Sequence, residues 1–276
     1  MLRLTRAIAG ADRDAPQCAH PGRAGMRFAA GIALLFAAAV AVTVLGCAAM
    51  AAQAQPMPGG WALSTAAMPM CGQGVPGAVH AFAVMWLAMM VAMMLPSLAP
   101  TLWRYRSMLD CARVRHADRR VAVAAAGYFA TWLLVGIALG VLGDAAGAAL
   151  LRRPAWSGAM PVVGGAVVLL AGVAQFSGWK QRHLAWCTAA FTPDDCVVRV
   201  LDAWRSGVRL GLHCNAACAN LTAVLLVFGL MDLRAMLLVT AAITAERLAP
   251  CAAQARKGVG IALVGVGAGL LVQALR

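Results

Sequence analysis

Long apolar runs, each bounded by charge, proline or glycine, limit what this chain can fold into. They cover residues 28–52, 80–102, 122–143, 159–177, 208–230, 234–250 and 258–275. About 20 apolar residues in a helix cross the hydrocarbon core of a bilayer. The chain is also 62% hydrophobic, which is more than globular domains usually hold. We therefore expect an all-α integral membrane protein, a polytopic helical bundle of about seven transmembrane helices.

The apolar runs and the loops between them account for most of the chain and leave only a short segment before the first run. Residues 1–26 are predicted to be a basic cytoplasmic tail, and residues 27–276 to form the transmembrane bundle. The first run, 28–52, also has features of a signal peptide, because basic residues precede it and a cleavage-like tripeptide ends it. Signal peptides hold only about 7–15 apolar residues, so a retained anchor is expected.

Basic residues are divided unevenly between the two sets of loops. Of the 23 Lys and Arg, 19 fall in the tail and in alternate loops on one side, and four on the other. Because cytoplasmic loops hold the excess, seven spans place the N-terminus in the cytoplasm and the C-terminus outside. The same clustering explains the net charge of +13 without nucleic acid, whose binding surfaces interleave basic and aromatic residues on one face. The expected partner is the lipid bilayer, with no nucleic acid.

The second apolar run is rich in methionine. Met85, Met89 and Met93 fall on one helical face, and Met90 and Met94 form a second row beside them. Thioethers are soft, uncharged ligands that suit Cu(I) and can lie in lipid. Met85, Met89 and Met93 are therefore a candidate metal pathway. Methionine also fills gaps at helix contacts, and composition alone leaves both interpretations open.

Two pairs of metal-ligating residues lie at the predicted cytoplasmic end. Cys214 and Cys218 are four residues apart in the fifth run, so both sulfurs project from one helix face. His183 and Cys187 have the same spacing in the preceding loop. Membrane cysteines at this spacing can also reflect the packing of small residues. Because the predicted topology brings both pairs to one membrane face, we expect these four residues to form a metal site.

Three further polar residues are candidates for a supporting shell. His213 points about 100° away from its neighbour Cys214 on an α-helix, so it is not expected to bind the same ion. Glu246 lies near the same cytoplasmic end, and ionisable groups in spans usually pair. Lys180 or Arg247 could be its partner, and a structural ion pair is an alternative to any role at the metal.

Three stretches of the chain resemble the predicted metal-binding integral membrane proteins, a bacterial family whose domain has no assigned function. They are the segment AMMVAMMLPSLAP, the segment from Lys180 to Cys187, and GLHCNAACANLTAVLLVFGLMDLRAM continuing to AERLAP. The resemblance covers about 80–250 and implies metal binding in the bacterial inner membrane. It also matches Glu246 to an acidic residue of the family.

The resemblance carries metal ligands over to individual positions. Where the family has two cysteines four residues apart, this chain has His183 and Cys187. The outer cysteines of the family's later motif correspond to Cys214 and Cys218, and its middle cysteine is replaced by Ala217. The substitution of His for Cys preserves a metal ligand, whereas the loss of the middle cysteine implies a site with fewer thiolate ligands.

These patterns predict a protein that binds a soft metal ion in the membrane and transfers or transports it. Cu(I) is the expected ion, with zinc not excluded, and a metal donor or acceptor protein is the expected partner. No enzymatic activity is expected. The alternatives are an assembly partner of a membrane complex and a membrane thiol–disulfide oxidoreductase. The latter is disfavoured because such enzymes use a Cys-x-x-Cys pair, which the sequence lacks.

Overall fold

The computed structural model describes residues 23–51, 75–152, 158–189, 191, 199–230 and 232–276, and over this part of the chain it contains helices and no strand. The predicted tail lies mostly outside the described residues. The helices are α2 (Arg23–Ala51), α3 (Val75–Cys111), α4 (Ala117–Arg152), α5 (Met160–Ala174), α6 (Gly178–Thr188), α7 (Val200–Phe228), α8 (Leu233–Leu248) and α9 (Ala252–Ala274). The all-helical expectation is confirmed for these residues.

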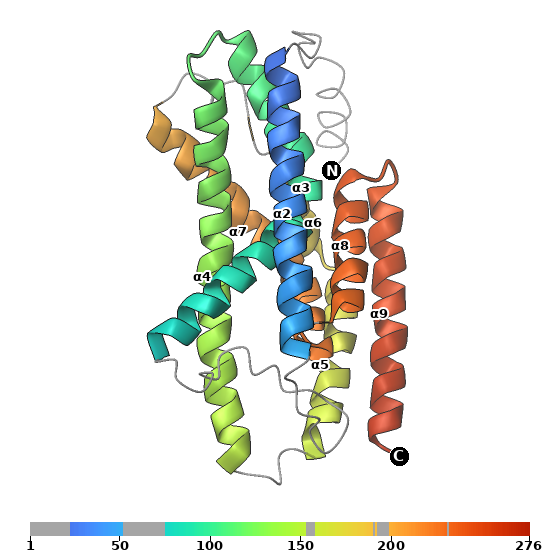
Figure 1. Cartoon of the computed structure of the whole chain (residues 1–276). Coiled ribbons are helices and arrows are strands. Elements are labelled where there is room, and N and C mark those ends of the chain that lie inside the picture. Colours follow the sequence, from blue (N-terminus) through green and yellow to red (C-terminus); the bar gives the residue numbers. More distant parts are fainter. Residues whose placement is uncertain (1–22, 52–74, 153–157, 190, 192–198, 231) are drawn as a thin grey trace.

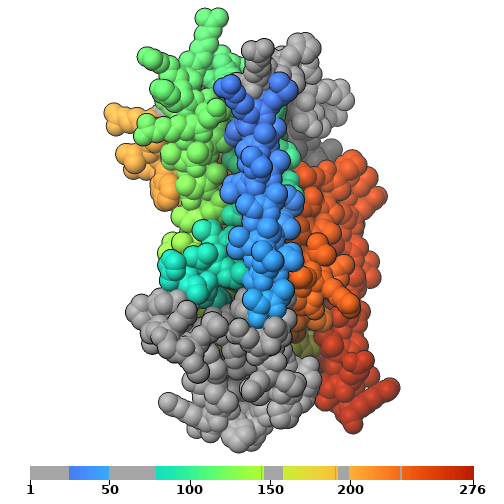
Figure 2. Space-filling view, in the orientation of Figure 1, coloured from blue at the N-terminus to red at the C-terminus, as the bar shows by residue number. Residues whose placement is uncertain are grey.

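The helices form an elongated bundle in which α3 and α7 cross the other helices obliquely (Figure 1). Helix α7 packs against α4, α5, α6 and α8, and α3 packs against α2, α4 and α8. Helix α2 lies on the outside, with α4 on one side and α8 on the other (Figure 2). Its apolar side chains, and those of α9, are largely exposed on the bundle surface.

Five described helices are long and apolar enough to cross a membrane: α2, α3, α4, α7 and α9. Helices α5 and α6 meet at a 64° bend and would add a sixth span if they act as one. A helix stands at each of the seven predicted positions, but a count of seven spans is not confirmed. The physical reason is length, since the 16 residues of α8 extend only about 24 Å against a hydrocarbon core of about 30 Å.

Local sequence explains where the helices around α7 begin and end. Gly229 ends α7 with φ +103°, a conformation that favours glycine. Asp232 then caps α8, because its Oδ1 accepts hydrogen bonds from the backbone N–H groups of Arg234 and Ala235 at 2.8 and 3.3 Å. Ser177 caps α6 in the same way by accepting from the backbone N–H of Lys180. The short α7–α8 connection therefore brings α8 back against α7.

Close packing of α4 and α7 fixes the height of α7 in the bundle. Gly207 of α7 lies directly against the carbonyl oxygen of Ala124, so a Cβ at this position would collide with the α4 backbone. Tyr128, one turn further along α4, consequently faces the middle of α7. The same contact places Cys214 beside Tyr128.

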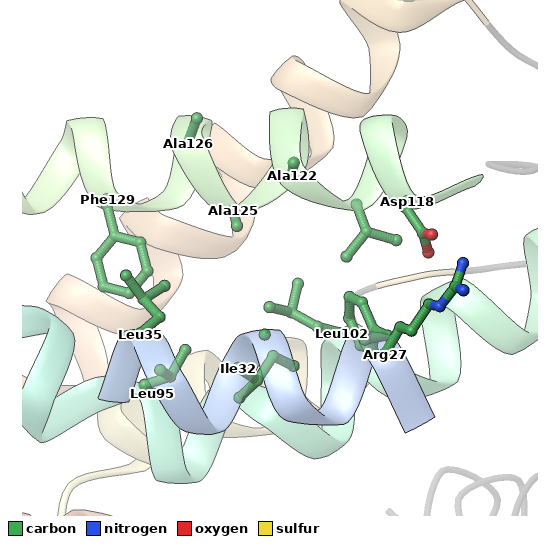
Figure 3. Close-up of a pocket in the computed structure, with 13 residues that line it drawn as sticks. Arg27, Ile32, Leu35, Leu95, Leu102, Asp118, Ala122, Ala125, Ala126 and Phe129 are labelled. Atoms are coloured by element: carbon green, nitrogen blue, oxygen red, sulfur yellow. The ribbon is translucent and has the colours of Figure 1, made fainter. Parts of the chain in front are cut away.

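A cavity of about 520 Å³ lies between α2, α3 and α4. Its lining is almost wholly apolar, with Arg27 and Asp118 at one end (Figure 3). No cysteine, histidine or methionine is among the residues that line it. The cavity is therefore separate from the predicted metal ligands.

Candidate metal centre

Three cysteine thiols from two helices meet in the core of the bundle. Cys187 lies in the last turn of α6, and Cys214 and Cys218 lie in the middle of α7. Cys214 Sγ is 3.9 Å from Cys218 Sγ and is also hydrogen-bonded to Cys187. The three residues are 2%, 0% and 4% exposed. The structure thus brings three of the four predicted ligands together, although it leaves metal binding itself untested.

The thiols have a hydroxyl and a guanidinium beside them. Tyr128 Oη lies 3.0 Å from Cys214 Sγ. The side chain of Arg247 hydrogen-bonds to Cys187 and donates from Nη1 to Ser97 Oγ at 3.0 Å. Arg247 also lies close enough to interact electrostatically with all three thiols. Any negative charge on the sulfurs would therefore face a fixed positive charge.

Lys180 and Glu246 form an ion pair beside the thiols. Lys180 Nζ lies 2.8 Å from Glu246 Oε2, and their side chains are 2% and 3% exposed. Lys180 Nζ also donates to Asn220 Oδ1 at 3.3 Å, and it interacts electrostatically with Cys218. Of the two partners expected for Glu246, the structure selects Lys180. Arg247 is consequently left to the thiols.

The methionine-rich face of α3 belongs to the same core. Met89, Met90, Met93 and Met94 are all buried there together with the three cysteines. Met85 is only partly buried, and its sulfur lies against Gly46 of α2. Both predicted rows of methionine are therefore interior, and the use of Met85, Met89 and Met93 as a pathway stays a prediction.

His183 does not join the thiols but lies against His213. Their Nδ1 atoms are 2.9 Å apart, and both residues are half-buried. His183 and Cys187 face α7 together, as their spacing predicts, but one turn of α6 separates them. Because α7 runs obliquely, His213 lies beside His183 and Cys214 lies beside Cys187.

Within the described residues, no group of three or more His, Cys, Asp or Glu side chains is arranged to hold a metal ion as it stands. The thiols are instead hydrogen-bonded in series, with Cys214 in the middle. Their chemistry nevertheless fits a soft ion, because thiolate and thioether sulfur favour Cu(I).

The sequence alone did not identify Tyr128 or the contact of Arg247 with the thiols. Tyr128 gave no signal beyond its place in an apolar run. The charge of Arg247 could have indicated a functional contact, because a charged residue near a helix end in a membrane usually has a specific partner. Because Arg247 follows Glu246 in the sequence, Glu246 was one of its expected partners, whereas the structure places Arg247 beside the thiols.

Comparison with known proteins gives one match. The PpoB2 copper chaperone family matches residues 83–270, which is more than half of the chain and includes every candidate ligand described above. No curated protein and no solved structure matches the chain.

Proposed function

The chain belongs to the PpoB2 copper chaperone family, and on this premise we propose that it binds Cu(I) through Cys187, Cys214 and Cys218 within its helical bundle and passes the ion to a partner protein. The observation that supports this most is the meeting of three buried thiols close to the positive charge of Arg247. The partner would be a donor or acceptor of copper, and the protein itself would catalyse no reaction.

Charge balance supports this assignment of the site. A thiol must lose its proton to bind a metal, and an uncompensated charge in a buried site is very costly. Cu(I) bound by two thiolates and one neutral thiol carries one negative charge, which the guanidinium of Arg247 would neutralise. Lys180 and Glu246 already neutralise each other. The core could therefore accept Cu(I) and two thiolates without burying a net charge.

The donor set favours Cu(I) over zinc. Cu(I) is served by two or three soft sulfur ligands, whereas structural zinc sites almost always take four ligands in a tetrahedron. Three thiols are present, and the nearest carboxylate is held by Lys180. The 3.9 Å between Cys214 Sγ and Cys218 Sγ already brings two of these sulfurs close enough to share one ion at metal–sulfur distances of about 2.3 Å.

We further propose that the bundle lies in the bacterial inner membrane with its N-terminus in the cytoplasm. The uneven division of basic residues between the loops supports this orientation, and the exposed apolar side chains of α2 and α9 support a location in the membrane. Seven helices would then cross the bilayer, with α8 held against α3, α7 and α9. Met85, Met89 and Met93 would provide a route for copper along α3.

Copper retention by purified full-length protein tests the site. Protein exposed to Cu(I) and freed of excess metal is expected to retain copper, and the Cys214→Ser/Cys218→Ser variant to lose nearly all of it. Cys251→Ser is the matched control, because Cys251 is exposed at the start of α9 and should change nothing. Equal copper in all three proteins would disprove the assignment of the thiols.

A further inference from the structure

The histidine pair lies at the surface beside the buried thiols. His183 from α6 and His213 from α7 face each other through the same ring nitrogen, with 2.9 Å between the Nδ1 atoms. His213 directly precedes Cys214, and His183 lies one helical turn before Cys187. The pair is half-buried, whereas the thiols are almost completely enclosed. It is therefore more accessible than the cysteines while remaining next to them in the chain.

Aromatic and basic side chains surround the two imidazoles. Trp186 stacks on His213, with 5.1 Å between ring centroids and an angle of 4°, and Trp179 contacts the edge of His183. Both tryptophans are 51% exposed, and Arg209 lies over the Trp186 ring at 5.6 Å. Exposed Trp with Arg is typical of the membrane–water interface. This setting gives the imidazoles contact with water and with a soluble partner.

The contact between the rings uses atoms that can bind metal. Two Nδ1 atoms can share a hydrogen bond only if one carries a proton and the other presents a lone pair. If that proton moves to Nε2 of the same ring, both Nδ1 lone pairs face a common point. Neutral imidazole is a good ligand for copper. Two nitrogens on separate helices can also open to the wider spacing that an ion needs.

We propose that His183 and His213 form a second, weaker copper site, through which Cu(I) exchanges between a partner protein and the buried thiols. This proposal rests on the copper function proposed above. Nitrogen ligands hold Cu(I) less tightly than thiolates, so the ion would pass from the surface pair to the sulfurs during loading. Stronger sulfur ligands inside and weaker nitrogen ligands outside would make uptake spontaneous and retention secure.

The transfer balances without a change of oxidation state. Cu(I) binds the two Nδ1 lone pairs as one proton shifts from Nδ1 to Nε2, so no proton leaves the pair. When the ion moves to the three cysteines, two of the thiols release their protons to water and the imidazoles restore their hydrogen bond. Copper stays Cu(I) throughout, and no further reactant is required.

The rate of loading separates this site from the thiol site. Full-length protein is mixed with a coloured Cu(I)–chelator complex whose absorbance falls as copper leaves it. The His183→Gln/His213→Gln variant is expected to load about tenfold more slowly, the loss typical of removing a supporting group of a metal site, yet to reach the wild-type copper content. His116→Asn is the control, because His116 is an exposed histidine outside both sites.

A second measurement detects copper at the histidines directly. The Cys187→Ser/Cys214→Ser/Cys218→Ser variant should still bind Cu(I) weakly, with quenching of tryptophan fluorescence because Trp186 stacks on His213. Adding His183→Gln/His213→Gln should abolish this binding. Adding Trp186→Phe to this triple-cysteine variant should preserve binding and remove most of the quenching.

The outcomes distinguish the two proposals. Wild-type loading rates in the histidine variant, together with no binding by the triple-cysteine variant, would overturn the surface site and leave the thiol site standing. A histidine variant that holds as little copper as Cys214→Ser/Cys218→Ser would place the histidines in the thiol site and also overturn this proposal. A wild-type protein that takes up no Cu(I) would instead overturn the copper function itself.

Discussion

Two helix pairs of this bundle pack equally closely but enclose very different side chains. Helices α4 and α7 meet through Gly207 against the backbone of Ala124, and α5 and α9 meet through Gly267 against the backbone of Leu169. The first contact holds α4 against the part of α7 where Tyr128 meets Cys214, whereas the second lies among apolar side chains. Close packing therefore serves as scaffold in both places, and only at α4–α7 does it also position ligands.

The largest expected effect comes from unpairing the charges beside the thiols. Lys180→Met leaves Glu246 buried without its partner, which should lower the free energy of unfolding by about 3–5 kcal/mol. Denaturant unfolding in detergent measures this change. In the Lys180→Met/Glu246→Met variant, which removes both charges, most of the stability should return. If the single and double variants were equally unstable, the ion pair would not be the cause.

Matched glycine substitutions test the comparison directly. Gly207→Ala and Gly267→Ala each push a Cβ into the backbone of a neighbouring helix, and overpacking of this kind usually costs about 1–3 kcal/mol. Both variants should unfold more easily. Only Gly207→Ala should also weaken copper retention by the folded protein, because it shifts Cys214 from Tyr128.

An open glycine on α9 provides the control for this pair. A Cβ at Gly269 would meet nothing within 4 Å, so Gly269→Ala should match the wild type in copper content and be slightly more stable, because alanine favours a helix interior over glycine by about 0.5–1 kcal/mol. If Gly267→Ala reduced the copper content of folded protein as much as Gly207→Ala, the division between scaffold and site would be wrong.

Removal of the guanidinium should weaken copper binding without unfolding the bundle. Arg247→Met takes away the positive charge beside the thiols, and we expect copper affinity to fall by about 10–100-fold, as for other groups that support metal ligands. Competition with a Cu(I) chelator measures the affinity. Arg247→Lys, which keeps the charge, should recover part of the loss. Equal affinity in the wild type and both variants would show that the positive charge does not support copper binding.

The smallest expected effect is at the tyrosine. Tyr128→Phe removes one hydroxyl that contacts Cys214 at 3.0 Å, a contact worth about 1 kcal/mol or a few-fold in affinity. The same chelator competition detects it. Thr131→Val is a useful control, because Thr131 lies one turn further along α4 and bonds Asn215 rather than a thiol. A larger loss from Thr131→Val than from Tyr128→Phe would mean that α4 packing matters more than the hydroxyl.

The sequence predicts much of this arrangement because spacing and apolar runs are local properties. Helices stand where the apolar runs predict them, and Cys214 and Cys218 share the face that their spacing gives them. The neighbour of His183 could not be predicted in this way. It depends on the bend between α5 and α6 and on the crossing of α7, which are set by tertiary packing. The same holds for Arg247, whose partner is chosen by the placement of Lys180.

The near-complete burial of the three thiols also bears on their chemical lifetime. Oxidation of cysteine to sulfenic acid and beyond depends on exposure of the sulfur as well as on its thiolate character. Among the cysteines of the described residues, Cys251 at the surface should therefore react with peroxide or an alkylating reagent before the buried Cys187, Cys214 and Cys218. A bundle built this way would keep both its ligands and a bound Cu(I) ion away from peroxide and other polar oxidants in water, so that the site survives until the metal is delivered.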